Sequence, residues 1–174
     1  TGIYRGGTNT IVIAAGGANK FYADASSYLA ILTAGTSNTA IGVNAGTAIE
    51  SGGNFNVLVG DDAGIALTTG DNNVALGYRA LFTEDTGNRS TAIGDFALTA
   101  QNNNDSNYNT GLGYAAGAGI TTGIQNSFVG GVSGLSITEA NQNVAVGYGS
   151  LDADTLGARN TAVGTNTLTT QNFT

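Results

Sequence analysis

Eight short segments with the same alternation of side chains recur along the chain, the first being NTAIG at residues 38–42. The others read NVLVG, NVALG, STAIG, NTGLG, NSFVG, NVAVG and NTAVG. In each segment a Thr, Val or Ser and a larger aliphatic residue flank a residue that is usually small. A period of two with β-branched residues predicts a short strand that has an aliphatic face and a face of small residues.

The segments are evenly spaced, because each ends in a glycine and the steps between these glycines are 18, 17, 17, 19, 17, 17 and 17 residues. The glycines are Gly42, Gly60, Gly77, Gly94, Gly113, Gly130, Gly147 and Gly164. A βαβ unit needs about 30 residues and a propeller blade about 40, so neither fits this period. The period predicts an all-β fold, a β-solenoid or parallel β-roll of about eight coils with about 17 residues each.

Within each coil the pattern predicts a strand, a bend at the glycine, a second short strand and a polar loop. The second strand is indicated by apolar triplets such as ALF at 80–82 and ALT at 97–99. A three-sided coil built from hexapeptides needs an aliphatic residue every six positions, but the series from Leu76 reaches Phe82 and then Asn88. A two-sided coil therefore fits better.

Asparagine opens most of the segments, beginning with Asn38. Equivalent positions in stacked parallel coils lie ~4.8 Å apart, where identical Asn side chains hydrogen-bond to each other as a ladder. Asn also tolerates the left-handed backbone conformation of a corner. We therefore interpret Asn38, Ile41 and the eight glycines as residues that define the structural repeat.

A longer repeat divides the solenoid in two. Residues 73–102 and 143–172 are identical at 15 of 30 positions, an offset of 70 residues or four coils. We assign the solenoid to residues 35–174, with super-repeats at 38–107 and 108–174, and residues 1–34 to a β connector or degenerate first coils. The second super-repeat stops where the first continues into another coil, which predicts that the chain is a segment of a longer protein.

Composition excludes several kinds of chemistry. The chain has no His and no Cys, so it has no Ser/His/Asp triad, no cysteine nucleophile and no imidazole or thiolate metal site. Five basic against twelve acidic residues argue against a nucleic-acid partner. No apolar run reaches the ~18 residues of a membrane span. We expect no enzyme and no cofactor.

Two acidic features remain as candidates for chemistry. Asp61 and Asp95 each follow a repeat glycine, two coils apart and so ~9.6 Å from each other. That separation suits an inverting glycosidase pair, although the super-repeat counterparts are Gly131 and Thr165. The runs GDDAG at 60–64 and DAD at 152–154 offer oxygen ligands for calcium, but neither matches a known calcium loop. Solvated turn carboxylates are the favoured interpretation.

Three tyrosines, Tyr78, Tyr114 and Tyr148, directly follow repeat glycines in alternate coils. A regular solenoid places them in a row with a step of ~9.6 Å, either stacked on sugar rings or, as we favour, packed over the corner or against a neighbouring chain. Arg89 and Arg159 occupy equivalent places after acidic loops, which favours ion pairs. A thin coil buries little apolar area, so we expect several copies to associate, packed along the face of small residues.

The runs NTAIGVNAG, NVALGYRAL, STAIGDFAL, NVAVGYGSL and NTAVGTNTL resemble the head repeats of trimeric autotransporter adhesins and repeats of phage tail fibres. The N-terminal TGIYRGGTNTIVIAAGGANKFYADAS looks more like phage fibre segments. The resemblance implies a left-handed parallel β-roll, a homotrimer, and an extracellular place on a virion tail fibre or a bacterial surface, with a cell-surface glycan or receptor as partner. Adhesin heads have a shorter repeat than this chain.

The sequence leaves two other functions open. An ice-binding solenoid needs a flat exposed array of Thr or similar residues on successive coils. The Thr/Val column alternates with the expected core aliphatics and is predicted to face inward, which weakens that hypothesis. A fibre-borne polysaccharide depolymerase depends on the Asp61 and Asp95 pair.

Overall fold

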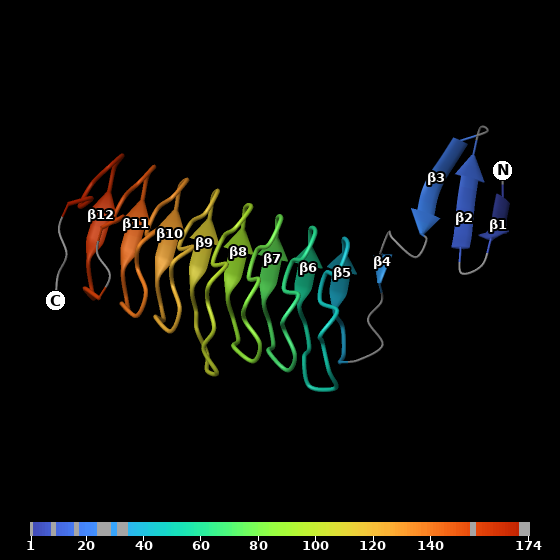
Figure 1. Ribbon diagram of the computed structural model, residues 1–174, viewed down its shortest axis with the longest axis horizontal. Coiled ribbons are helices and arrows are strands. Elements are labelled where there is room, and N and C mark those ends of the chain that lie inside the picture. Colours follow the sequence, from blue (N-terminus) through green and yellow to red (C-terminus); the bar gives the residue numbers. More distant parts are fainter. Residues whose placement is uncertain are drawn as a thin grey trace.

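The computed structural model describes residues 2–7, 10–15, 18–23 and 29–30 as strands, and residues 35–153 and 156–170 with their side chains. In these ranges the chain is all β, and none of the described residues is helical. Figure 1 shows the main feature, a row of eight similar coils that stack side by side, from β5 to β12.

The row is one parallel sheet, ordered β12-β11-β10-β9-β8-β7-β6-β5, with the short β4 paired antiparallel to β5 at its end. Equivalent residues pair in register, as Val74 does with Thr91 and Leu76 with Ile93. The strands are β5 (Thr39–Ile41), β6 (Val57–Val59), β7 (Val74–Leu76), β8 (Thr91–Ile93), β9 (Thr110–Leu112), β10 (Ser127–Val129), β11 (Val144–Val146) and β12 (Thr161–Val163). The predicted parallel solenoid is confirmed, with seven complete turns between eight strands.

The N-terminal strands form a separate antiparallel sheet in the order β1-β2-β3. Its strands are β1 (Gly2–Gly7), β2 (Thr10–Ala15) and β3 (Ala18–Ala23), and β4 (Leu29–Ala30) follows them. Because β4 pairs antiparallel with β5, it covers the edge of the parallel sheet at that end.

The orientation of the strands is opposite to the prediction. In each of the strands β5–β12 the middle residue points into the coil and is buried, whereas the two residues that flank it face outward. Ala75 is fully buried, while Leu76 keeps 44% of its surface exposed. The small residues therefore line the interior, and the aliphatic face, which we expected to form the core, lies on the surface.

The reason is that the core is filled from the opposite side of the coil. Leu81, Leu98 and Leu151 reach it from the turn after the glycine, and the facing strand residue is then Ala or Gly. Where the strand residue is large, as at Leu58 and Phe128, the turn carries glycine instead. A Cβ on Gly64 would lie 2.8 Å from Leu58, and one on Gly134 would lie 2.5 Å from Phe128. Six of the eight layers therefore carry one large side chain. In the coil of β9 both residues are glycines, Gly111 and Gly117, and Leu98 and Phe128 of the neighbouring coils lie beside Gly117.

The predicted second strand is wrong, because overlapping turns take its place. Three turns cover residues 60–67, each closed by a backbone hydrogen bond of 3.1–3.3 Å between residues three apart. Asp62 and Gly64 have φ of 57° and 55°, as a type II turn requires at its third position. Arg79 and Leu81 hold the same conformation one coil later. Hydrogen bonds between coils, such as that from the Leu81 N–H to the Ala97 carbonyl at 3.0 Å, fix these turns.

The asparagine ladder is confirmed. The Asn56 N–H donates to Asn38 Oδ1 at 2.9 Å, and Asn56 Nδ2 donates to the same oxygen at 3.1 Å and to the Gly70 carbonyl at 2.8 Å. Each inward-pointing amide therefore satisfies buried backbone groups of neighbouring coils. The left-handed conformation predicted for these asparagines lies one residue earlier, for example at Phe55, where φ is 59°.

A polar cluster replaces part of the apolar core between the coils of β7 and β9. Glu84 and Gln101 are fully buried at positions where other coils carry Ile49, Leu67, Ile120 and Ile137. Gln101 Nε2 donates to Glu84 Oε2 at 2.9 Å and to Ser90 Oγ at 2.7 Å, where the ladder lacks an asparagine. Burial raises the pKa of the Glu84 carboxyl, although hydrogen bonds from Gln101, Gly87 and Asn103 oppose that rise.

This buried carboxyl predicts a pH-dependent stability. A pKa that is higher in the folded chain than in the unfolded chain means that the folded state binds the proton more tightly. The stabilisation is therefore fully present below the unfolded value of 4.5 and is lost as the pH rises through the raised pKa. We expect the free energy of unfolding of wild type to fall over this window relative to Glu84→Gln, measured by urea denaturation at pH 4–8. Parallel curves for the two proteins would contradict this expectation.

Candidate functional site: the outward face of the parallel sheet

The outward side chains of β5–β12 form one continuous surface, which we call the aliphatic face. One column holds Thr39, Val57, Val74, Thr91, Thr110, Ser127, Val144 and Thr161, and the other holds Ile41, Val59, Leu76, Ile93, Leu112, Val129, Val146 and Val163. Ile41 and Leu112 keep 42% and 43% of their surface exposed, close to the fraction at Leu76. No described polar side chain other than Thr and Ser interrupts the face.

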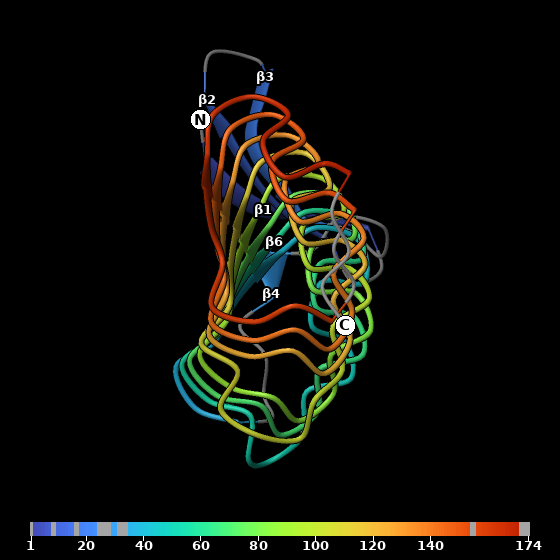
Figure 2. The ribbon, with the colours of Figure 1, turned by 90° about the vertical axis from the view of Figure 1, so that its left-hand side faces the viewer.

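Strand register keeps the aliphatic face continuous. Each strand pairs in the same register with the next from β5 to β12, so seven steps of ~4.8 Å make the face ~34 Å long. Figure 2, viewed along the stack, shows the coils turned progressively relative to one another, so the face twists as a parallel sheet does. A monomeric protein rarely leaves such a long ordered apolar surface open to water. The aliphatic face is therefore the candidate surface for contact with a partner.

A repeat glycine ends each strand and turns the chain away from the aliphatic face. These glycines have φ between 124° and 137°. From Gly42 to Gly147, a Cβ would lie no more than 2.7 Å from the carbonyl oxygen of the next repeat glycine. The repeat therefore needs glycine at this position both for its conformation and for the close approach of successive coils.

An aromatic strip, made of Tyr78, Phe96, Tyr114 and Tyr148, runs along the edge of the aliphatic face beyond the glycines. The Phe96 ring centroid lies 5.2 Å from that of Tyr78 and 6.1 Å from that of Tyr114, with both pairs edge to face. Tyr114 is 60% exposed and Tyr78 is 36% exposed. The three tyrosines predicted to form a row therefore lie at the surface, and Phe96 completes the row.

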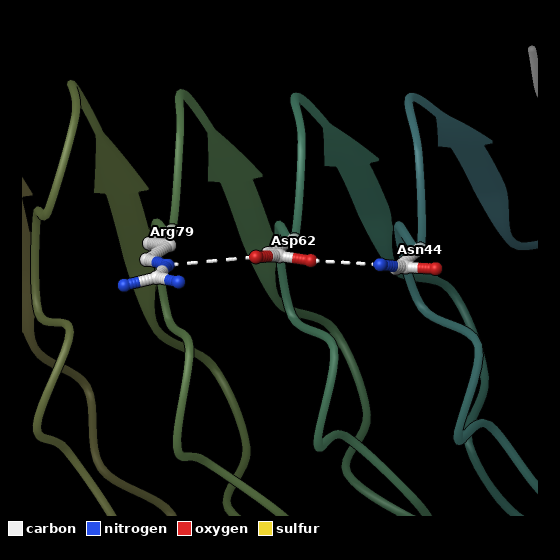
Figure 3. A network of polar contacts seen from close by, with 3 residues as sticks. All are labelled: Asn44, Asp62 and Arg79. Atoms are coloured by element: carbon white, nitrogen blue, oxygen red, sulfur yellow. Dashed lines mark hydrogen bonds and ion pairs between the residues drawn. The ribbon is translucent and has the colours of Figure 1, made fainter.

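Polar contacts between coils hold the start of the strip (Figure 3). Asn44 Nδ2 donates to Asp62 Oδ1 at 3.0 Å, and Arg79 Nε donates to Asp62 Oδ2 at 3.4 Å, across three successive coils. The Arg79 guanidinium then lies 5.0 Å from the ring centroid of Tyr78 and 4.9 Å from that of Phe82. Asp62 and Arg79 were missed as partners, although both stand two residues after a repeat glycine, a spacing that signals contact between coils.

Within one chain the described residues form no ion pair at Arg89 or Arg159, so the prediction is wrong for contacts inside the chain, and an ion pair between chains stays a prediction. Arg89 donates to Ser106 Oγ and lies 5.6 Å from the ring centroid of Tyr108. Arg159 Nε donates to Gln142 Oε1 at 3.0 Å. In the described ranges the ion pair is Arg79 with Asp62. Both arginines instead bond along the stack, on the opposite edge of the aliphatic face from the aromatic strip.

The acidic candidates take part in the turns. Asp61 and Asp95 are exposed and lie in the column of the tyrosines, and Asp95 Oδ1 accepts a hydrogen bond from the Tyr78 N–H at 2.9 Å. Asp62, in the GDDAG run, is engaged by Asn44 and Arg79. Within residues 35–153 and 156–170 no three acidic side chains gather as metal ligands would. Asp154, in the second candidate run, lies outside the described residues.

Comparison with known proteins adds no relatives: no family model, no curated protein and no solved structure matches this chain. The described part of the chain contains no helix of the length and apolarity that a membrane crossing requires. The fold and the surface therefore define the class, a parallel β-solenoid with an exposed aliphatic face.

Proposed function

We propose that this chain is a structural and adhesive fibre module of a phage tail fibre or a bacterial surface adhesin. In this proposal identical chains associate through the aliphatic face and build a stiff shaft or head that presents a receptor-binding surface. The observation that carries it is the outward, in-register position of aliphatic side chains on all eight strands, each exposed or half-buried. The resemblance of the repeats to trimeric adhesin heads and tail fibres supports three chains per assembly and an extracellular location.

The energetics favour association. Complete burial of a Val, Leu or Ile side chain contributes about 1.5–3 kcal/mol, so covering a half-exposed one contributes about 1 kcal/mol. Eight larger aliphatic positions on one chain, together with the Val residues beside them, contribute on the order of 10 kcal/mol, which is comparable to the cost of bringing chains together. Because the interior of the coil is already filled by Leu and Phe, the aliphatic face supplies the second core that a thin solenoid needs.

The function proposed is mechanical rather than catalytic. The repeated residues form the backbone turns, the asparagine ladder, the core and the aliphatic face. The acidic side chains of Asp62 and Asp95 accept hydrogen bonds from neighbouring coils. A rod of stacked coils, hydrogen-bonded at every step, resists bending and holds its surface in a fixed geometry.

Sedimentation velocity with the double variant Leu76→Asp/Leu112→Asp tests this proposal. Wild type is expected to sediment as an assembly of more than one chain, and the double variant as single chains, because two buried carboxylates per copy cannot be accommodated. Leu156→Asp is the matched control, since Leu156 is also exposed but lies in the loop before β12. If wild type sediments as a single chain at all concentrations, the proposal is wrong.

The observed orientation of the Thr/Val column favours a second function, ice binding. The Thr/Val column faces outward rather than inward, and in this one register Thr39 and Thr161 are exposed whereas Thr91 and Thr110 are half-buried. Valine and serine occupy the other four places, and the sheet twists, so the array is neither uniform nor flat. Thermal hysteresis of wild type, lost in Thr91→Leu/Thr110→Leu, would favour ice binding over the fibre module.

A further inference from the structure

The aromatic strip has a geometry that the aliphatic face does not explain. The rings of Tyr78 and Tyr114 flank that of Phe96 edge to face along the stack. The ring carbons Cδ2 and Cε2 of Tyr148 lie 3.4 and 3.6 Å from the place where a Cβ of Gly131 would stand. Tyr148 therefore leans over the residue without a side chain and extends the strip from the coil of β7 to that of β11.

The tyrosines repeat on alternate coils, about 9.6 Å apart, along an axis parallel to the rod. The first of them is held in place, since Arg79 stacks on Tyr78 and is anchored by Asp62. Aromatic rings in a fixed row bind a flat, rigid partner at a low entropic cost. An extended pyranose chain advances about as far per sugar as the solenoid does per coil, so alternate sugars meet alternate rings.

The charges around the aromatic strip indicate which class of ligand it can bind. Asp61, Asp62 and Asp95 surround the start of the strip, with Arg79 as the one base among them. The whole chain also carries a net charge of −7, so an anionic polymer is repelled. Asp95 uses Oδ1 for the Tyr78 N–H, and its other oxygen is available to accept a sugar hydroxyl. Carboxylate acceptors beside exposed rings suit an uncharged polyhydroxylated ligand.

We propose that the aromatic strip binds a neutral, extended polysaccharide laid along the rod axis. The C–H faces of alternate sugars pack on Tyr78 and Tyr114, and their hydroxyl groups donate to Asp61 and Asp95. This inference rests on the proposed fibre function, for which it names the class of receptor.

Affinity electrophoresis of the assembled protein tests the inference, in native gels that contain hydroxyethyl cellulose, galactomannan or, as the anionic comparison, polygalacturonate. Wild type is expected to be retarded by a neutral polysaccharide and not by polygalacturonate. Tyr78→Ala/Tyr114→Ala is expected to lower the association constant about tenfold. Tyr108→Ala is the matched control, because Tyr108 is 51% exposed on the opposite edge, and it is expected to bind as wild type does.

Three binding results would overturn the inference: no retardation of wild type by either neutral polysaccharide, equal retardation of the double tyrosine variant, or retardation by polygalacturonate as strong as that by the neutral polysaccharides. Sedimentation of the same samples separates this failure from that of the fibre proposal. A double tyrosine variant that falls apart into single chains would assign the strip to the contact between copies, and so also overturn it. Single-chain wild type that is still retarded would contradict the assembly and support the binding strip.

Discussion

Gly77→Ala is expected to lower the free energy of unfolding by about 4 kcal/mol, from backbone strain and overpacking together. Gly77 has a φ of 136°, a conformation that residues with a Cβ rarely adopt. A Cβ there would lie 2.6 Å from the carbonyl carbon of Gly94 and 2.9 Å from the Asp95 nitrogen. Both are backbone atoms of the next coil, so no side chain can move aside and the stack itself must open.

Urea denaturation followed by circular dichroism measures this effect, and Gly131→Ala is its control. Gly131 directly follows the repeat glycine Gly130, and a Cβ there would make an ordinary contact of 3.4 Å with Tyr148. The control is expected to change stability by no more than about 0.5 kcal/mol. Equal losses in the two variants would show that the repeat glycines do not set the distance between coils.

Phe128→Ala is expected to cost about 4 kcal/mol, because it removes the largest fully buried side chain in the described part of the core. Phe128 fills the space beside Gly117 and Gly134, and neither glycine has a side chain that could occupy the cavity left behind. Urea denaturation again measures the loss. Phe55→Ala, at an exposed phenylalanine, is expected to change stability little.

The same site allows a stricter test by compensation. In the next coil a small strand residue, Ala145, stands with a large turn residue, Leu151, whose φ of 54° is close to the 61° of Gly134. Adding Gly134→Leu to Phe128→Ala recreates that arrangement and is expected to recover about half of the lost stability. A double variant no more stable than Phe128→Ala would contradict the conclusion that one large side chain, from either the strand or the turn, fills this layer of the core.

Repetition explains why the parallel solenoid could be predicted. The period of 17 residues, the strand segments and the asparagine ladder each depend on one residue meeting its own equivalent in the next coil. Such contacts are present in the sequence as spacing. The pairing of Asp62 with Arg79 and of Glu84 with Gln101 follows the same 17-residue rule, so it could have been found in this way.

The direction of the strands could not be predicted from alternation alone, because a period of two does not say which face is inside. Which face points inward is decided by the residues across the coil, where Leu58 lies opposite Gly64 and Phe128 opposite Gly134. The turns were missed because large side chains such as Leu81 are unfavourable at positive φ. Hydrogen bonds from the next coil hold Leu81 there, and those bonds exist only once the coils have stacked.

Disulfide trapping tests most directly whether the aliphatic face is a contact between copies, since the chain has no native cysteine to interfere. Leu76→Cys places a thiol on that face, and Leu156→Cys places one at a similarly exposed position in the loop before β12. On mild oxidation of dilute protein, Cys at position 76 is expected to link chains rapidly and Cys at position 156 slowly. Equal rates at the two positions, or no linked chains from position 76, would contradict association through the aliphatic face.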